Sequence, residues 1–499
     1  MSKIPEKVKD IVELRPYSSI EDFLRDPAIT LANYHFSDIT SELIVKWFDA
    51  IGSDGRSGSC RALAGFRGVG KSHFLAMVST IAAYPELRSK LDDPYVAAAA
   101  QRLPRRHYPV VNVRRGRKES LVEELVEAVC ISFDIKPSSG SSSVREILQN
   151  AKAIAGDLPP IILIDTDAAR PARVERNDGP ILAEIAAVAS KTGCFVGIAL
   201  DDDISSADGP NSAIAGGFTI DFLDQEHLYK VVSGRIFPKV QRMRGVLSGL
   251  YETIREAHPD FRWSEQRFSS LYPLHPATMD VAPFVRLYVP NFAVLGFASA
   301  VGETILARPA DSLIGLEEVF DASEAELRKA KDLESAFASY DQLVTKEIPA
   351  MPSGIGQKAT LIPKTLFLLS LDGRGSTVSE IASSALVFEA GDRDKTIPQV
   401  EAILRAFVQA MPDRIIIRST KDSTPIYSIR LRSDELGGVL ESGLKDLPVE
   451  MADVVFLNAV KARFPELASL AVSSDAVCDP IDLQVQWRGG LRPGRCGTT

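Results

Sequence analysis

The chain has 499 residues, of which 45% are hydrophobic and 25% charged, so it has the composition of a soluble globular protein with room for two to four domains. Its formal net charge of −9 gives no global positive field that would draw it to nucleic acid or an anionic membrane, so any contact with DNA must be local. The five cysteines are scattered and signal neither a disulfide framework nor a zinc site, and the chain starts without the apolar core of a signal peptide. We therefore expect a cytoplasmic protein without a membrane span.

The first part of the chain, residues 1–58, carries short helical patterns. The clearest covers 41–51, where apolar residues recur at helical spacing, and the segment ends in the glycine- and serine-rich run 52–58. We expect an N-terminal helical adaptor here, followed by the main core of the protein.

Residues 65–72 match the pattern G-x-x-x-x-G-K-[ST] of a phosphate-binding loop. Glycines let the backbone wrap around a phosphate chain, so that successive N–H groups point at the α- and β-phosphates. Lys71 would reach the β- and γ-phosphates, and the Ser72 hydroxyl would hold Mg²⁺. The expected nucleotide-binding residues are Gly65, Phe66, Arg67, Gly68, Val69, Gly70, Lys71, Ser72 and His73.

The surroundings of the loop fit this interpretation. The apolar run 61–66 ends at the loop as a buried strand should, and residues after it show helical spacing. Further strands are expected at 108–113, 161–164, 194–200 and 218–222, with helices at 71–84, 119–133, 143–155 and 180–192. Such alternation predicts an α/β fold over 59–236, a P-loop NTPase core of the AAA-like type with helices on both faces of a parallel sheet.

A phosphate-binding loop needs a second carboxylate for Mg²⁺, and Asp165 supplies it at the end of the apolar run 161–164. Active ATPases of this type often place a glutamate next, but here Thr166 and then Asp167 follow. The candidate metal residues are Ser72 and Asp165, and the candidate catalytic residues are Lys71, Asp165 and Asp167. Hydrolysis is thus less strongly indicated than binding, and Asp165 could also simply end a buried strand.

Several charged groups leave alternatives open. Asp201 could sense the γ-phosphate or belong to an exposed acidic turn, and the sequence cannot choose an arginine finger among Arg235, Arg242 and Arg244. Two basic clusters, at 102–107 and 114–118, could contact a phosphate backbone, although a solvated face is the simpler interpretation.

The rest of the chain is mostly helical. Residues 237–357 are expected to form a helical lid, with pieces at 240–254, 277–287 and 324–343 and a rigid Tyr-Pro-Leu-His-Pro corner at 272–276. Residues 358–432 show helices and then strands in the order of a winged helix. Residues 433–499 end in a stretch, 487–497, with neither helical nor strand period, and we expect the chain to be the start of something longer.

The loop at 65–75, the Asp165 strand and the corner at 271–276 resemble those of the large P-loop ATPases of BREX-type bacterial phage defence, the BrxC and PglY kind. The resemblance covers about 55–350. More distantly, the chain resembles the origin-recognition and STAND branches of the AAA-type ATPases. The resemblance implies ATP with Mg²⁺ as cofactors and work in a multi-subunit, DNA-directed defence complex, while Thr166 departs from the acidic pair common in the family.

Three functions follow from these features. The first is an ATPase that couples nucleotide state to conformational change in a DNA-associated complex, with partner proteins and a homo-oligomer as possible assemblies. The second is a nucleotide-dependent scaffold with little hydrolysis, which Thr166 favours. The third is a nucleotide-sensing transcription regulator that binds DNA through the winged helix alone.

Overall fold

The computed structural model describes residues 6–52, 58–66, 68–135, 143–166, 178–201, 217–240, 244–386, 393–419, 424–431, 481–487 and 490–496. The chain divides into two compact units, Met1–Arg432 and Ser433–Thr499.

A parallel five-stranded sheet forms the core of the first unit. Its strands are β1 (Ser59–Gly65), β2 (Val110–Arg115), β3 (Ile161–Thr166), β4 (Phe195–Asp201) and β5 (Thr219–Phe222), in the order β2-β3-β4-β1-β5. All five strands lie close to their expected positions, so the predicted α/β P-loop fold is confirmed. Because parallel strands end at one edge, the carboxyl ends of β1 and β3 come together there.

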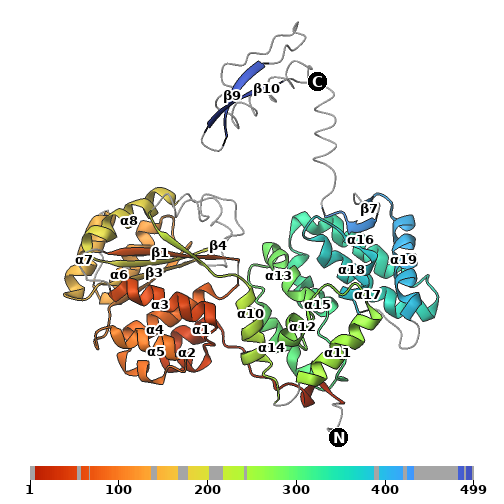
Figure 1. The fold of residues 1–499 in the computed structure, drawn as a ribbon, viewed down its shortest axis with the longest axis horizontal. Helices are drawn as coiled ribbons and strands as arrows, with labels where there is room; N and C mark the ends of the chain where they lie inside the picture. The colour runs from red at the N-terminus through yellow and green to blue at the C-terminus, as the bar shows by residue number, and fades with distance from the viewer. Residues whose placement is uncertain are drawn as a thin grey trace. The chain divides into compact units, whose positions relative to one another are not determined.

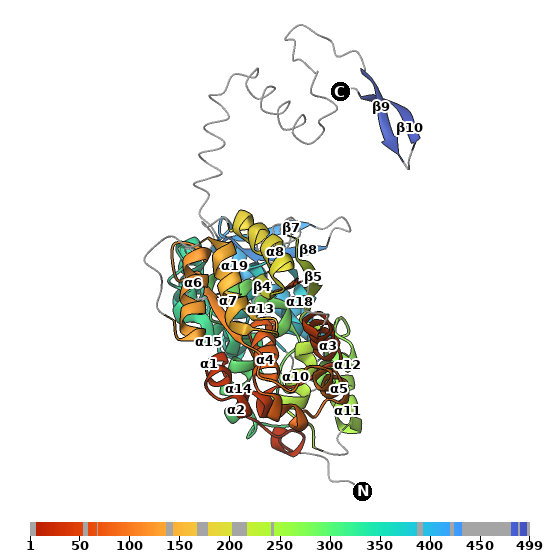
Figure 2. The ribbon, with the colours of Figure 1, turned by 90° about the vertical axis from the view of Figure 1, so that its left-hand side faces the viewer.

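Helices cover both faces of this sheet (Figures 1 and 2). One face packs against α3 (Asp38–Gly52), α4 (Lys71–Ala83) and α5 (Pro94–Arg102). The other packs against α6 (Leu121–Phe133), α7 (Val144–Ala155) and α8 (Gly179–Thr192). Side chains along a strand alternate between faces, so neighbours such as Ala62 and Leu63 enter different clusters.

The N-terminal 52 residues contact two hydrophobic cores. Val8, Ile11 and Val12, at and after the short 3₁₀ helix Val8–Asp10, are buried in a cluster with side chains from residues 228–429. By contrast, α2 (Pro27–Asn33) and α3 bury Leu31, Ile44 and other side chains against the sheet. Between them lies α1 (Ile20–Arg25). The segment expected as an adaptor thus packs against both clusters, and its status as a separate domain stays a prediction.

The helical region after β5 starts with α10 (Glu226–Val231) and one π-helical turn, Val232–Ile236. It continues with α11 (Arg244–Ala257), α12 (Glu265–Leu271), α13 (Ala277–Tyr288), α14 (Val294–Ile305), α15 (Leu316–Leu327) and α16 (Glu334–Gln342). The single helix expected at 324–343 is wrong, because Ala330 is extended, with φ −79° and ψ 112°, and the chain turns there between α15 and α16.

The corner at 271–276 joins α12 to α13 and is built around a buried histidine. His275 Nε2 donates to the Ser383 carbonyl at 3.1 Å, and its Nδ1 accepts the Ala277 N–H at 3.0 Å. Burial lowers the pKa of His275 to about 3, so the ring is neutral and its tautomer is set by these two contacts. The expected rigid corner is therefore a hydrogen-bonded joint.

The last part of the first unit contains three helices and a small antiparallel sheet. In chain order these are α17 (Ser353–Ser370), β6 (Ser376–Thr377), α18 (Val378–Ser384), α19 (Arg393–Ala410), β7 (Ile415–Ser419) and β8 (Pro425–Ile429), with strand order β6-β8-β7.

In the second unit, β9 (Ile481–Trp487) pairs antiparallel with β10 (Gly490–Cys496). The stretch 487–497, which shows neither helical nor strand period in the sequence, thus contains the end of β9 and all of β10. Within the described ranges, no helix has both the length and the apolar character needed to cross a membrane.

Candidate phosphate-binding site

The phosphate-binding loop lies between the end of β1 and the start of α4. Gly68 has φ +75° and Gly70 has φ +102°, a left-handed conformation that favours glycine at both positions. Gly70 is the N-cap of α4, so the partial positive charge of this helix end faces the loop. Of the predicted loop residues, Arg67 lies outside the described ranges, and the others are found where the motif predicts.

The side chain of Lys71 folds back over the loop 65–72, of which Lys71 is a member. Its ammonium group donates to the Gly65 carbonyl at 2.6 Å and to the Phe66 carbonyl at 2.8 Å, and the residue is only 7% exposed. These contacts keep a positive charge beside backbone N–H groups. A negative phosphate chain placed in the loop would meet both.

Ser72 and Asp165 lie side by side across two elements, the first turn of α4 and the end of β3. Ser72 Oγ donates to Asp165 Oδ1 at 2.9 Å, and Arg114 Nη1 donates to Asp165 Oδ2 at 2.6 Å. Burial raises the pKa of Asp165, while Arg114, Ser72, the Thr166 N–H and Lys71 oppose this rise. The sequence predicted the serine and the aspartate but not the arginine.

The residues fit a magnesium ion that arrives with phosphate. A hydroxyl and a carboxylate are the oxygen ligands that Mg²⁺ prefers, and it commonly completes its shell with phosphate oxygens and water. No cluster of three or more histidine, cysteine or acidic residues able to hold a metal occurs among the described residues. Asp167, the candidate base, lies outside the described ranges.

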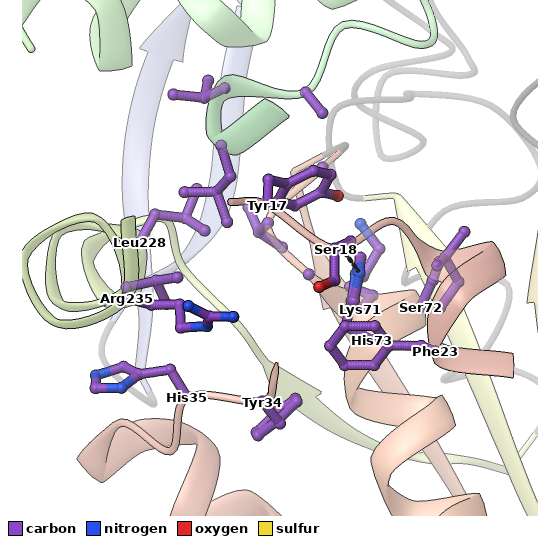
Figure 3. Close-up of a pocket in the computed structure, with 18 of the residues that line it drawn as sticks. Tyr17, Ser18, Phe23, Tyr34, His35, Lys71, Ser72, His73, Leu228 and Arg235 are labelled. Carbon is purple, nitrogen blue, oxygen red and sulfur yellow. Dashed lines mark hydrogen bonds between the residues drawn. The ribbon is translucent and has the colours of Figure 1, made fainter. Parts of the chain in front are cut away.

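A pocket of about 310 Å³ opens beside the loop. Figure 3 shows Lys71, Ser72 and His73 on one side and Leu228, Arg235 and His35 on another. The lining comes from the N-terminal segment, the loop with α4, the ends of β3 and β4, the helix after β5 and the residues around the start of α14. Besides the loop, its members include Tyr17, Ser18, Phe23, Asn33, Tyr34, His35, Thr166, His227, Leu228, Arg235, Pro290 and Phe292.

His73 joins the loop helix to the N-terminal segment. Its Nε2 lies 3.4 Å from the Ser18 carbonyl, and its ring meets the Phe23 ring edge-on with centroids 4.4 Å apart (Figure 3). Burial lowers the pKa of His73 to about 4, so the ring is neutral at pH 7. His73 therefore lines the pocket without adding charge to it, and its predicted part in nucleotide binding stays a prediction.

Two arginines of the helical region approach the same site. Arg235 donates from Nη2 to Asn33 Oδ1 at 2.5 Å, which ties the π-helical turn to the end of α2. Arg286 of α13 places its guanidinium against Gly68, so that a Cβ on Gly68 would clash with it. Of the other two finger candidates, Arg242 lies outside the described ranges, and only the backbone of Arg244 is described.

Several members of the two basic clusters pair with acidic residues, one of them in a buried ion pair and others at the surface. Arg115 forms an ion pair with Asp178 at 2.6 Å, with both side chains buried. Arg102 pairs with Asp49 at 2.5 Å, and Arg106 lies 3.7 Å from Asp157. Together with the Arg114–Asp165 contact, these pairs offset part of the positive charge of the two clusters.

The sequence did not indicate that Tyr17, Arg114 and Arg286 belong to the site. No local motif marks any of them. Arg114 lies beside Asp165 because β2 pairs with β3 in the sheet. The sequence alone does not predict which strands are neighbours.

No family model matches the chain, and no curated protein matches it. Solved structures that are similar to it include the Orc1 protein of Aeropyrum pernix in complex with DNA, at 16% identity over 83% of this chain and 94% of that chain, with a TM-score of 0.29. The Cdc6p of Pyrobaculum aerophilum is 11% identical over 84% and 98%, with a TM-score of 0.30. AMPPCP-bound DnaA from Aquifex aeolicus is 12% identical over 77% and 93%, with a TM-score of 0.28.

Proposed function

We propose that this protein binds ATP with Mg²⁺ at the loop 65–72 and uses the nucleotide to change how its helical lid meets its α/β core. The observation that carries the proposal is the joint placement of Lys71, Ser72 and Asp165 around one loop. These groups supply the charge, the hydroxyl and the carboxylate that a bound nucleoside triphosphate and its metal need.

The pocket beside the loop supports a nucleotide over a small phosphate ligand. Its lining extends from the loop to aromatic and aliphatic side chains such as Tyr17, Tyr34 and Leu228, which suit a base and a sugar. The sequence resemblance suggests adenine as the base. When bound, Mg²⁺ would neutralise phosphate charge, and Ser72 and Asp165 would orient it.

The same pocket explains how a nucleotide could act on the lid. Arg235 lines it and Arg286 lies against Gly68 of the loop, both from the helical region, while Lys71 and Ser72 belong to the core. Phosphate charge would attract groups from both sides, so the nucleotide favours one arrangement of the two parts. We infer a switch in which ATP holds lid and core together.

The wider role is proposed from the sequence resemblance: work within a multi-subunit, DNA-associated phage-defence complex in the cytoplasm, with a homo-oligomer as one possible assembly. The elements between α17 and β8 follow one another as in a winged helix, which supports a DNA or protein contact there. The alternative is a nucleotide-dependent scaffold with little hydrolysis, which the uncharged Thr166 after Asp165 favours.

Mg²⁺-dependent ATP turnover tests these proposals. Wild type, Lys71→Ala and Asp167→Asn are measured with and without duplex DNA, and nucleotide binding is measured in parallel. We expect Lys71→Ala to lose binding and Asp167→Asn to keep binding but lose turnover. ATP binding without turnover under every condition would favour the scaffold, and stimulation by DNA would favour the DNA-associated ATPase.

A further inference from the structure

The Arg114 side chain already binds the Asp165 carboxylate, which the proposed metal site needs. Arg114 and Asp165 are partners in the parallel register of β2 and β3, so they leave the sheet at the same edge. Arg114 Nη1 donates to Asp165 Oδ2 at 2.6 Å, while Asp165 Oδ1 accepts Ser72 Oγ and the Thr166 N–H. Both carboxylate oxygens therefore accept hydrogen bonds from the protein itself.

The charge balance at this edge makes the contact consequential. Asp165 is the one acidic residue among the described residues that line the pocket, whereas Lys71 and Arg235 contribute positive charge. The side chains of Arg114 and Asp165 are 26% and 13% exposed, so solvent screens their attraction only in part. A guanidinium at this position cancels the negative charge that would otherwise draw a divalent cation.

The backbone around Arg114 is fixed, so an exchange of partners is confined to its side chain. The next residue, Arg115, is held by the buried pair with Asp178. The loop that follows is held by Glu124, whose Oε1 accepts the N–H groups of Gly116, Arg117 and Lys118 at 2.7, 2.6 and 2.9 Å. The long, partly exposed side chain of Arg114 can swing away while the strand and loop stay in place.

We propose that Arg114 is a resident counter-ion that competes with Mg²⁺ for the Asp165 carboxylate and thereby sets how strongly nucleotide binding depends on the metal. This inference rests on the nucleotide-binding function proposed above. Without metal, Arg114 keeps Asp165 neutralised, so that the carboxylate does not repel the phosphates. With metal, Asp165 gives up its contact with Arg114. Arg114 is a positioning residue in this scheme, because it acts through Asp165.

The test compares the dissociation constant of a fluorescent ATP analogue in excess EDTA with that in excess Mg²⁺, using the full chain. The dissociation constant in EDTA divided by that in Mg²⁺ measures the metal dependence directly and requires no turnover. We expect this ratio to rise about tenfold in Arg114→Gln, because a charged hydrogen bond of this kind changes an equilibrium by about that factor. Binding in EDTA should weaken and binding in Mg²⁺ should tighten.

The matched control is Arg117→Gln, which removes the same charge three residues away, where the side chain is exposed. Its ratio should equal that of wild type. Arg114→Lys keeps the charge but loses the planar fork and should raise the ratio about two- to threefold, and it also serves if Arg114→Gln fails to fold. A ratio in the Arg114 variants that equals or falls below the wild-type value would overturn the inference. Absence of binding by wild type in both buffers would instead overturn the nucleotide-binding proposal, and the inference with it.

Discussion

At the scale of single residues, the sequence predicted which groups gather at the candidate site but not the partner of each group. Lys71, Ser72 and Asp165 stand where the motif and the apolar strand predicted, since short motifs encode local backbone geometry. Arg114 belonged to an apparent surface cluster, and only the pairing of β2 with β3 brings it to Asp165. The roles of Asp167 and Arg67 stay predictions, because both lie outside the described ranges.

The buried ion pair between Arg115 and Asp178 leads to a prediction about stability. Changing Asp178 to Asn leaves the Arg115 charge buried beside a neutral amide, so we expect unfolding to become easier by about 3 kcal/mol. Asp157→Asn, which alters the exposed contact with Arg106, should change nothing measurable. Chemical denaturation followed by circular dichroism measures both, and equal stabilities for the two variants would contradict the prediction.

At the scale of elements, strands and helices of the core were predictable because their apolar periods are long and regular. The short elements were not. Helix α5 spans only Pro94–Arg102 and buries Val96, Ala99 and Ala100, a pattern too brief to separate from a loop. The break between α15 and α16 was missed because the surrounding sequence keeps a helical period on both sides. Tertiary packing decides such cases.

Helix α7 offers a test of capping. Ser143 accepts the Glu146 N–H, and Glu146 in turn accepts the Ser143 N–H at 2.9 Å, which forms a capping box. We expect Ser143→Ala to lower the free energy of unfolding by about 1 kcal/mol. Ser190 lies near the C-terminal end of α8, on the same face of the sheet, and has no capping role. Ser190→Ala should therefore be close to neutral. A thermal melt of the three proteins would detect the difference, and a Ser190 effect as large as that of Ser143 would argue against it.

The first turn of α15 carries a pH-dependent group. Burial, together with the nearby Glu318 and Asp321, raises the pKa of Glu317 from its ordinary 4.5 to about 7. As pH rises from 4.5, the unfolded chain releases this proton while the folded chain keeps it, so stability falls until pH passes 7. Glu317→Gln removes the ionisable group and should be more stable than wild type by about 2 kcal/mol at pH 8, with little difference at pH 4.5.

Denaturation curves at several pH values check this expectation. Glu326→Gln is the control, because Glu326 lies on the same helix in an exposed pair with Lys329. Its effect should not grow with pH. A Glu317→Gln variant that is less stable than wild type at pH 8 would show that the carboxylate is stabilised rather than penalised there.

At the scale of the whole molecule, one pocket joins parts of the chain that the sequence placed in separate regions. The N-terminal segment, the loop, the turn after β5 and the stretch before α14 all contribute to it. Apolar periods and motifs describe one element at a time, so this convergence could not be predicted from the chain. The N-terminal segment that lines the pocket also packs against both hydrophobic cores.

If a nucleotide fills this pocket, it should slow hydrogen exchange in several distant segments together. We expect protection at 16–23, 227–236 and 290–295 on addition of ATP and Mg²⁺, because all three line the pocket with the loop. Helix α7, which contributes nothing to the lining, is the internal control. Protection confined to the loop alone would mean that the nucleotide does not bring lid and core together.

Binding of a nucleoside triphosphate by the loop 65–72 through Lys71 can be measured by equilibrium titration with a fluorescent ATP analogue. Wild type and Lys71→Ala are compared in Mg²⁺ by fluorescence anisotropy, with folding verified by circular dichroism. We expect saturable binding by wild type and an affinity at least about tenfold lower for Lys71→Ala, the loss expected when a charged contact to phosphate is removed. Equal affinities for the two proteins, or no binding by wild type, would contradict it.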